Sequence, residues 1–224
     1  MIYPSGFDFL NTLQKNNNRE WFAEHKDEFL KEQALLEAFA DDVLKQLNTQ
    51  DVIETVSGKK SMYRIYRDTR FSKDKTPYKT HWSGSFKRAG KSRRGGYYFH
   101  IEPGNSFVAG GFWGPNAEDL KLIRDNLAFD ASALREIIQS QSFVSNFGNL
   151  KGDQLKTTPK GFDAGHPDID LLRYKQFILI KKYTDEQVLA QGFPELVVQT
   201  FFQMRPFLDY MTEIMTTDAN GMDL

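Results

Sequence analysis

Four strand-like runs follow one another in the middle of the chain, and this arrangement constrains the fold more than any other feature. Aromatic or branched residues recur in all four runs, which are Met62–Phe71, His81–Lys87, Gly96–Glu102 and Ser106–Trp113. Turn-forming residues separate the runs. Parallel strands need crossover connections of about a dozen or more residues, whereas antiparallel strands can be joined by short turns. We therefore predict an antiparallel meander over residues 61–113.

The segments on either side of this block have helical patterns. Apolar residues recur at helical spacing in residues 26–47, and Asn18 is a good N-cap for a shorter helix before them. A C-terminal helix is predicted from Pro194 towards Met215, and Tyr174–Lys182 is predicted as one more strand. We therefore predict a single α+β domain over residues 1–224, with N-terminal and C-terminal helices flanking the antiparallel sheet.

Composition excludes several kinds of site. The chain has no cysteine, so disulfides, thiolate nucleophiles and cysteine-ligated metals are excluded. No run approaches the ~18 apolar residues that a membrane helix needs, and the first ten residues lack the pattern of a signal peptide. We therefore expect a cytoplasmic protein that does not bind membranes.

The charge is distributed unevenly along the chain. Residues 59–94 hold 13 of the 29 Lys and Arg residues but only two acids, a local charge of +11. Because the net charge is −1, the remainder of the chain carries −12. Such a contrast creates a local positive potential and favours an anionic partner at that surface, either a small molecule or a nucleic acid.

The most basic stretch is residues 61–81, SMYRIYRDTRFSKDKTPYKTH. Alternate residues of a strand share a face, so Arg64, Asp68 and Arg70 are predicted to point the same way. Two guanidinium groups beside one carboxylate could hold an oxyanion through paired hydrogen bonds. The predicted ligand-binding residues are Arg64, Arg67, Asp68, Arg70, Lys73, Lys75 and Lys79. The alternative is a structural ion-pair ladder followed by a solvated lysine turn. The surplus of cations over acids favours anion binding.

A second set of residues could transfer protons. His100 and Glu102 lie two apart on one predicted strand, and His81 begins a neighbouring one. Together they could form a general acid–base pair or a two-histidine, one-carboxylate metal set. Because any strand with a His-x-Glu sequence has this spacing, we predict neither a metal site nor a cofactor from it. The candidate catalytic residues are His81, His100, Glu102 and Asp68.

Several long motifs resemble one known family. They are NNREWF at 17–22, RIYRDTRFSKDK at 64–75, PYKTH at 77–81, GYYFHIEPG at 96–104 and GGFW at 110–113. The sequence resembles a conserved-hypothetical, domain-of-unknown-function family that is common in bacteria and also found in fungi. The resemblance extends from about Gly6 to Tyr210. It implies no established activity and no recognised catalytic residues.

Three functions are compatible with these features. The first is a module that binds a phosphorylated small molecule or a nucleic acid through the basic stretch. The second is an enzyme that holds an anionic substrate with arginine and transfers protons with His, Glu or Asp. The third is a protein-interaction scaffold with an acidic partner. The sequence leaves the identity of the ligand and the oligomeric state open.

Overall fold

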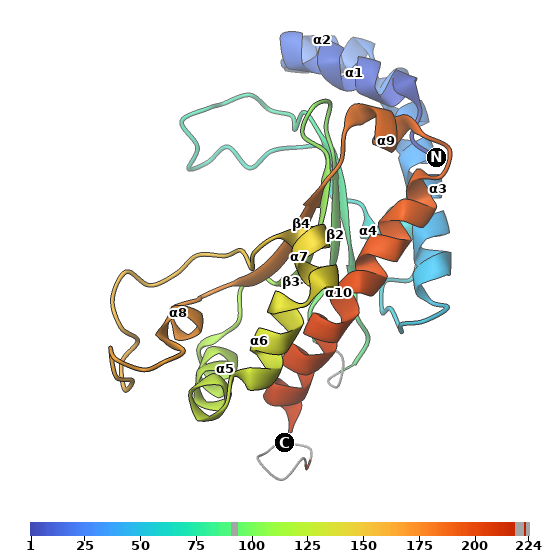
Figure 1. The fold of residues 1–224 in the computed structure, drawn as a ribbon. Helices are drawn as coiled ribbons and strands as arrows, with labels where there is room; N and C mark the ends of the chain where they lie inside the picture. The colour runs from blue at the N-terminus through green and yellow to red at the C-terminus, as the bar shows by residue number, and fades with distance from the viewer. Residues whose placement is uncertain (91–93, 218–221, 223–224) are drawn as a thin grey trace. The chain divides into compact units, whose positions relative to one another are not determined.

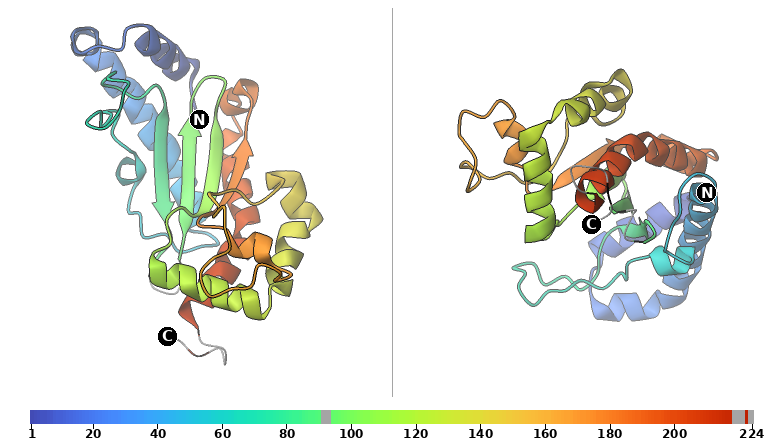
Figure 2. Two further views of the ribbon diagram at one scale, coloured as in Figure 1. Left: turned by 90° about the vertical axis from the view of Figure 1, so that its left-hand side faces the viewer. Right: turned by 90° about the horizontal axis from the view of Figure 1, so that it is seen from below.

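The computed structural model describes residues 1–90, 94–217 and 222 (Figure 1). Four antiparallel strands form one sheet in the order β1-β2-β3-β4, and Figure 2 shows them side by side. Their bounds are Trp82–Lys87 for β1, Gly96–Ile101 for β2, Phe107–Phe112 for β3 and Phe177–Lys182 for β4. The predicted α+β class, the antiparallel meander from residue 82 onwards and the added strand near residues 174–182 are confirmed.

Helices make up most of the remaining regular structure. They are α1 (Pro4–Lys15), α2 (Arg19–Glu24), α3 (Lys26–Leu47), α4 (Gly58–Ser61), α5 (Ala117–Phe129), α6 (Ser132–Gln139), α7 (Gln141–Phe147), α8 (Ile169–Leu172), α9 (Asp185–Leu189) and α10 (Phe193–Thr216). The Asn18 side chain accepts a hydrogen bond from the Trp21 N–H and caps α2, as predicted. In the described part of the chain, every helix is too short or too polar to cross a membrane.

The first strand of the predicted meander is not formed. Residues 62–71 make only isolated antiparallel bridges, between Met62 and Gly84 and between Tyr66 and Tyr78. The segment instead turns back on itself as an irregular loop. The N–H of Arg67 donates to the carbonyl of Pro77 at 2.8 Å, which joins the two arms of this loop.

Two aspartates explain why a strand is replaced by turns. Asp68 accepts a hydrogen bond from the backbone N–H of Arg70 at 3.2 Å, and Asp74 accepts one from that of Thr76 at 2.9 Å. Aspartate side chains that bond the backbone two residues ahead favour turns over strand ladders. Arg64, Asp68 and Arg70 therefore do not share a strand face, and the prediction that they do is wrong.

Residue contacts divide the chain into two compact units. Unit 1 comprises Met1–Phe86, Tyr98–Val108 and Lys182–Gln199. Unit 2 comprises Lys87–Tyr97, Ala109–Lys181 and Thr200–Leu224. The single domain over residues 1–224 stays a prediction.

Unit 1 has an aromatic core on one face of its strands. Phe39 of α3 meets Phe99 of β2 edge-on, with ring centroids 5.6 Å apart, and it stacks on Phe193 at 5.8 Å. The Trp82 ring of β1 stacks on Phe29 at 5.5 Å. Because strand residues alternate between faces, this packing leaves the intervening residues of β1 and β2 on the opposite face.

Unit 2 has its own core and its own ion pairs. The Tyr97 ring packs on Phe201 with centroids 4.8 Å apart. Arg88 is buried and bonds Asp209, while Arg94 bonds Asp119. Two further cations of the basic segment, Lys91 and Arg93, lie outside the described residues.

Candidate functional site

Of the predicted set Arg64, Asp68 and Arg70, only Asp68 and Arg70 form an ion pair. Arg70 Nε donates to Asp68 Oδ1 at 2.9 Å, and Arg70 Nη2 donates to Asp68 Oδ2 at 2.7 Å. This bidentate bond is the main cause that lowers the pKa of Asp68. The Arg70 side chain is 78% exposed. Asp68 thus neutralises Arg70 at the surface, as the alternative reading of an ion-pair ladder expects.

Two further cations of the motif hold the loop together. Arg67 Nη1 donates to Asp74 Oδ2 at 2.5 Å and to the Thr76 carbonyl at 3.2 Å. Lys75 Nζ donates to the carbonyl of Thr69 at 2.8 Å. These contacts connect residues within the loop and stabilise it. Arg67 and Lys75 therefore have a structural role.

Arg64 and Lys79 differ from Lys73 and Lys75, which also form no ion pair among the described residues, because Arg64 and Lys79 interact electrostatically with each other. Neither of them forms an ion pair with any acid in the described residues. Arg64 is exposed, and Lys79 is half-buried with its Nζ 5.6 Å from the centroid of the Tyr63 ring. Burial lowers the pKa of Lys79, and the positive charge of Arg64 lowers it further. The two cations therefore repel each other, and Arg64 also interacts electrostatically with Asp68. Lys73, the remaining cation of the motif, is exposed.

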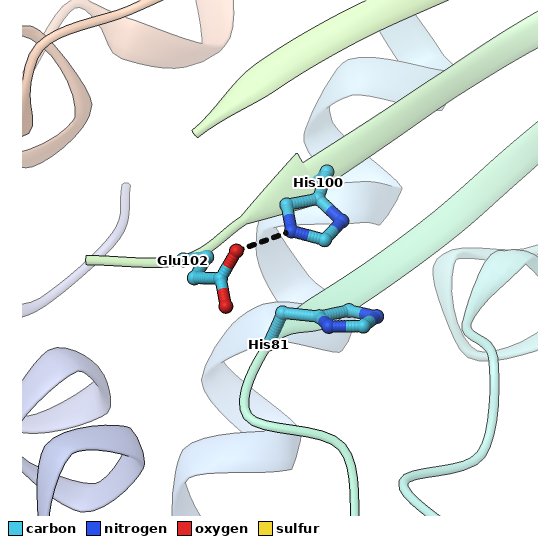
Figure 3. A group of neighbouring side chains, drawn as sticks. All are labelled: His81, His100 and Glu102. Atoms are coloured by element: carbon cyan, nitrogen blue, oxygen red, sulfur yellow. Dashed lines mark hydrogen bonds and ion pairs between the residues drawn. The ribbon is translucent and has the colours of Figure 1, made fainter. Parts of the chain in front are cut away.

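The candidate proton-transfer residues lie together on the sheet face opposite the aromatic core (Figure 3). His81 immediately precedes β1, His100 lies in β2 and Glu102 immediately follows it. The two imidazole centroids are 4.1 Å apart, and His100 Nε2 lies 3.0 Å from Glu102 Oε2. The structure brings these three predicted residues together. It does not bring Asp68 to them, because Asp68 bonds Arg70 in the loop.

Neighbouring side chains fix the orientation of this cluster. His100 is 8% exposed and stacks on Phe107 with ring centroids 4.6 Å apart. The Tyr98 hydroxyl lies 3.1 Å from His100 Nδ1. Asn105 Nδ2 donates to Glu102 Oε2 at 2.8 Å. Residue spacing alone did not single out Tyr98 or Asn105. Strand alternation was the available signal for Tyr98, which lies two residues before His100.

The protonation of the cluster follows from its surroundings. Burial, followed by the charge of nearby His100, lowers the pKa of His81 to about 4. For Glu102, burial raises the pKa, but hydrogen bonds from Asn105 and His100 outweigh it and lower the pKa overall. At neutral pH the carboxylate is therefore ionised and accepts hydrogen bonds only.

An ionised Glu102 determines which ring nitrogen of His100 carries the proton. His100 Nε2 must bear a hydrogen to bond the carboxylate, so in neutral imidazole Nδ1 accepts the hydroxyl proton of Tyr98. The result is a directed chain from Tyr98 through His100 to Glu102. Such a chain can accept or deliver a proton, and its nitrogen and oxygen atoms can also coordinate a cation.

A cavity of about 660 Å³ lies beside the loop, within unit 1. It is lined by Asn17, Asn18, Arg19, Glu20, Tyr66, Arg67, Thr69, Lys75, Thr76, Pro77 and Tyr78. Two predicted ligand-binding residues, Arg67 and Lys75, are among them. Both already have partners inside the loop. Of the three cations in this wall, Arg19 was not predicted.

Comparison with known proteins identifies a family but no activity. No curated protein and no solved structure matches the chain. The sequence model of a family described as conserved hypothetical protein (DUF2461) matches residues 5–210. That range includes the loop, the histidine cluster and all four strands of the sheet. The chain therefore belongs to the DUF2461 family of conserved hypothetical proteins.

Proposed function

We propose that the protein binds a small anionic ligand, carrying a phosphate or a carboxylate, at Arg64 and Lys79. The observation that supports it is the electrostatic repulsion between these two cations, neither of which forms an ion pair in the described residues. Like charges destabilise each other, and an anion between them removes the repulsion. Arginine and lysine donors also match the oxygens of phosphate and carboxylate.

A small molecule fits these charges better than a nucleic acid does. Nucleic-acid affinity comes largely from many cations that each neutralise one phosphate. In the described part of the basic segment, Arg67, Arg70 and Arg94 already pair with acids. Arg88 also pairs with an acid, so fewer cations remain to follow a phosphate backbone than the sequence suggests. We further propose a cytoplasmic location, where phosphorylated and carboxylated small molecules are abundant.

A second candidate function is an enzyme that acts on the bound anion. The Tyr98–His100–Glu102 chain favours it, because a histidine held between a hydroxyl and a carboxylate is arranged for general acid–base chemistry. Lys79 contributes to the electrostatic environment of His81, so the proposed anion site and the cluster are close enough to interact. Conversion of an identified ligand, lost in Glu102→Gln while binding is kept, tests this candidate.

The binding proposal is tested with defined anions and matched variants. Inorganic phosphate and panels of phosphorylated and carboxylated metabolites are screened by thermal shift, and affinities are measured by calorimetry. Arg64→Ala and Lys79→Ala are expected to weaken binding by about 10-fold to 100-fold, because each removes a charge-assisted hydrogen bond. Arg70→Ala and Lys73→Ala remove the same charge from the same loop and serve as controls.

Two outcomes would contradict the binding proposal. One is an affinity that falls as much in Arg70→Ala and Lys73→Ala as in Arg64→Ala, since that indicates a general charge effect. The other is tight binding of an oligonucleotide whose affinity falls steeply between low and moderate salt, because that is the behaviour of a nucleic-acid-binding surface.

A further inference from the structure

We propose that His81, His100 and Glu102 bind a divalent transition-metal ion. One ligand atom from each residue can be chosen so that all lie within 4.8 Å of one another (Figure 3). Metal–ligand bonds of about 2.0–2.2 Å to imidazole and carboxylate place neighbouring ligand atoms roughly 3 Å apart. His100 Nε2 and Glu102 Oε2 are already 3.0 Å apart. A rotation of the half-buried His81 side chain is then enough to complete the set.

The surroundings of the three residues resemble those of a preformed metal site. A ligating histidine usually donates its second N–H to an outer hydrogen-bond acceptor, which fixes its orientation. His100 has such a partner in Tyr98, whose hydroxyl is in turn hydrogen-bonded to Ser83. Phe107 stacks on the same imidazole and restricts its rotation. The orientation of the His100 ring is therefore fixed on two sides.

At His100, metal binding requires a change of tautomer and no change in the number of protons. Without metal, the Nε2–H group donates to Glu102 and Nδ1 accepts from Tyr98. With metal, the Nε2 lone pair binds the ion, and the proton resides on Nδ1 and is donated to the Tyr98 oxygen. The Tyr98 hydroxyl then donates to Ser83. The number of protons on these groups is unchanged.

The ligand types indicate which ions fit. Two imidazoles and one carboxylate suit Zn²⁺, Fe²⁺, Mn²⁺ and Co²⁺, whereas Ca²⁺ and Mg²⁺ prefer oxygen ligands throughout. Three protein ligands leave at least one coordination position for water or for an oxygen of a bound anion. The ion would carry more positive charge than Glu102 neutralises. The metal site does not depend on Arg64 or Lys79, so it does not rest on the proposed anion binding.

The test uses untagged protein, because a polyhistidine tag binds the same ions. The protein is stripped with a chelator and titrated with Co²⁺ and Zn²⁺, with stoichiometry measured by elemental analysis and calorimetry. Visible absorption of Co²⁺ reports the coordination. We expect one ion per chain and a loss of at least about 100-fold in affinity in His81→Ala and in Glu102→Gln. The chain has four histidines. His25→Ala and His166→Ala remove the other two and are expected to bind as the wild type does.

Further variants keep the test decisive. Tyr98→Phe removes only the outer hydrogen bond and is expected to weaken binding by about 10-fold to 100-fold. Arg64→Ala and Lys79→Ala are expected to retain the metal, so a failure of anion binding is distinguishable from a failure of metal binding. Folding of each variant is checked by circular dichroism. Equal Co²⁺ affinity in the wild type and in folded His81→Ala and Glu102→Gln overturns the proposal, as does an affinity that depends on His25 or His166.

Discussion

Asp68 and Asp74 make the same two kinds of contact, one with an arginine side chain and one with a backbone N–H two residues ahead. Each aspartate therefore neutralises an arginine and also stabilises a turn. This is why a segment with so many cations can fold as an ordered loop. It also separates the cations that hold the loop from Arg64 and Lys79, which form no ion pair among the described residues.

Replacement of Asp74 is expected to destabilise the protein in a pH-dependent way. Hydrogen bonds from the Thr76 backbone, Arg67 and the Thr76 hydroxyl hold the pKa of Asp74 at about 2, below its ordinary 3.8. A carboxyl with a lowered folded-state pKa contributes stability above its unfolded pKa, and this contribution is lost as pH falls through the folded pKa. The melting temperature of Asp74→Asn should therefore lie below that of the wild type by a constant amount above about pH 4. The gap should shrink towards pH 2.

Thermal melts followed by circular dichroism between pH 2 and pH 7 measure this gap. A gap that stays constant down to pH 2 contradicts the assigned role of the ionised carboxylate. A gap that is absent at neutral pH shows that the loop does not contribute to global stability.

At the scale of elements, the short helix α4 is packed closely against α3 in unit 1. Gly58, the first residue of α4, donates its N–H to Asp41 Oδ1 at 2.5 Å. A Cβ atom at this position would lie 2.2 Å from the Glu37 carbonyl oxygen and 2.5 Å from the Asp41 nitrogen. Both are backbone atoms of a long helix and cannot rotate away. Only glycine fits this contact.

Gly58→Ala is therefore expected to cost about 1–3 kcal/mol or more of unfolding free energy, because the two helices must move apart. Urea denaturation measures the change. Gly114→Ala is a suitable control, since a Cβ there meets nothing within 4 Å, and it is expected to change stability by less than about 0.5 kcal/mol. Equal stability of the Gly58→Ala variant and the control would mean that α4 detaches from α3 at little cost.

The success of sequence prediction also differs from element to element. The bounds of α3 were predicted correctly because its apolar residues keep helical spacing along its whole length. The strand over residues 62–71 was predicted wrongly, because residue alternation carries no information about aspartate side chains that bond the backbone. Strand alternation and the meander did place His81, His100 and Glu102 in one site. The partner of each loop cation depends on the fold of the loop, so the isolation of Lys79 could not be predicted.

At the scale of the whole molecule, the uneven charge is partly balanced within each unit. In unit 2, Arg88 and Arg94 of the basic segment bond Asp209 and Asp119, which come from the acidic remainder of the chain. In unit 1, two of the arginines bond Asp68 and Asp74, the two acids already counted in the surplus of +11 over residues 59–94. The pairs with Asp209 and Asp119, which lie outside the segment, therefore reduce the charge available to a ligand below that surplus.

The two contact units are expected to unfold together. Each is assembled from stretches that alternate along the sequence, and β2, β3 and α10 each contribute residues to both. Unfolding of either unit would therefore disrupt elements that also belong to the other. We therefore expect a single calorimetric transition whose van't Hoff and calorimetric enthalpies agree, as for one domain.

Substitutions placed in one unit at a time make this prediction testable. Gly58→Ala acts in unit 1, and Leu134→Ala removes a fully buried side chain of unit 2 at an expected cost of about 2–5 kcal/mol. If the chain unfolds cooperatively, each substitution lowers the temperature of the one transition and leaves its shape unchanged. If the units unfold separately, each substitution moves only the transition of its own unit. The scan then resolves two steps, and the prediction of a single domain is wrong.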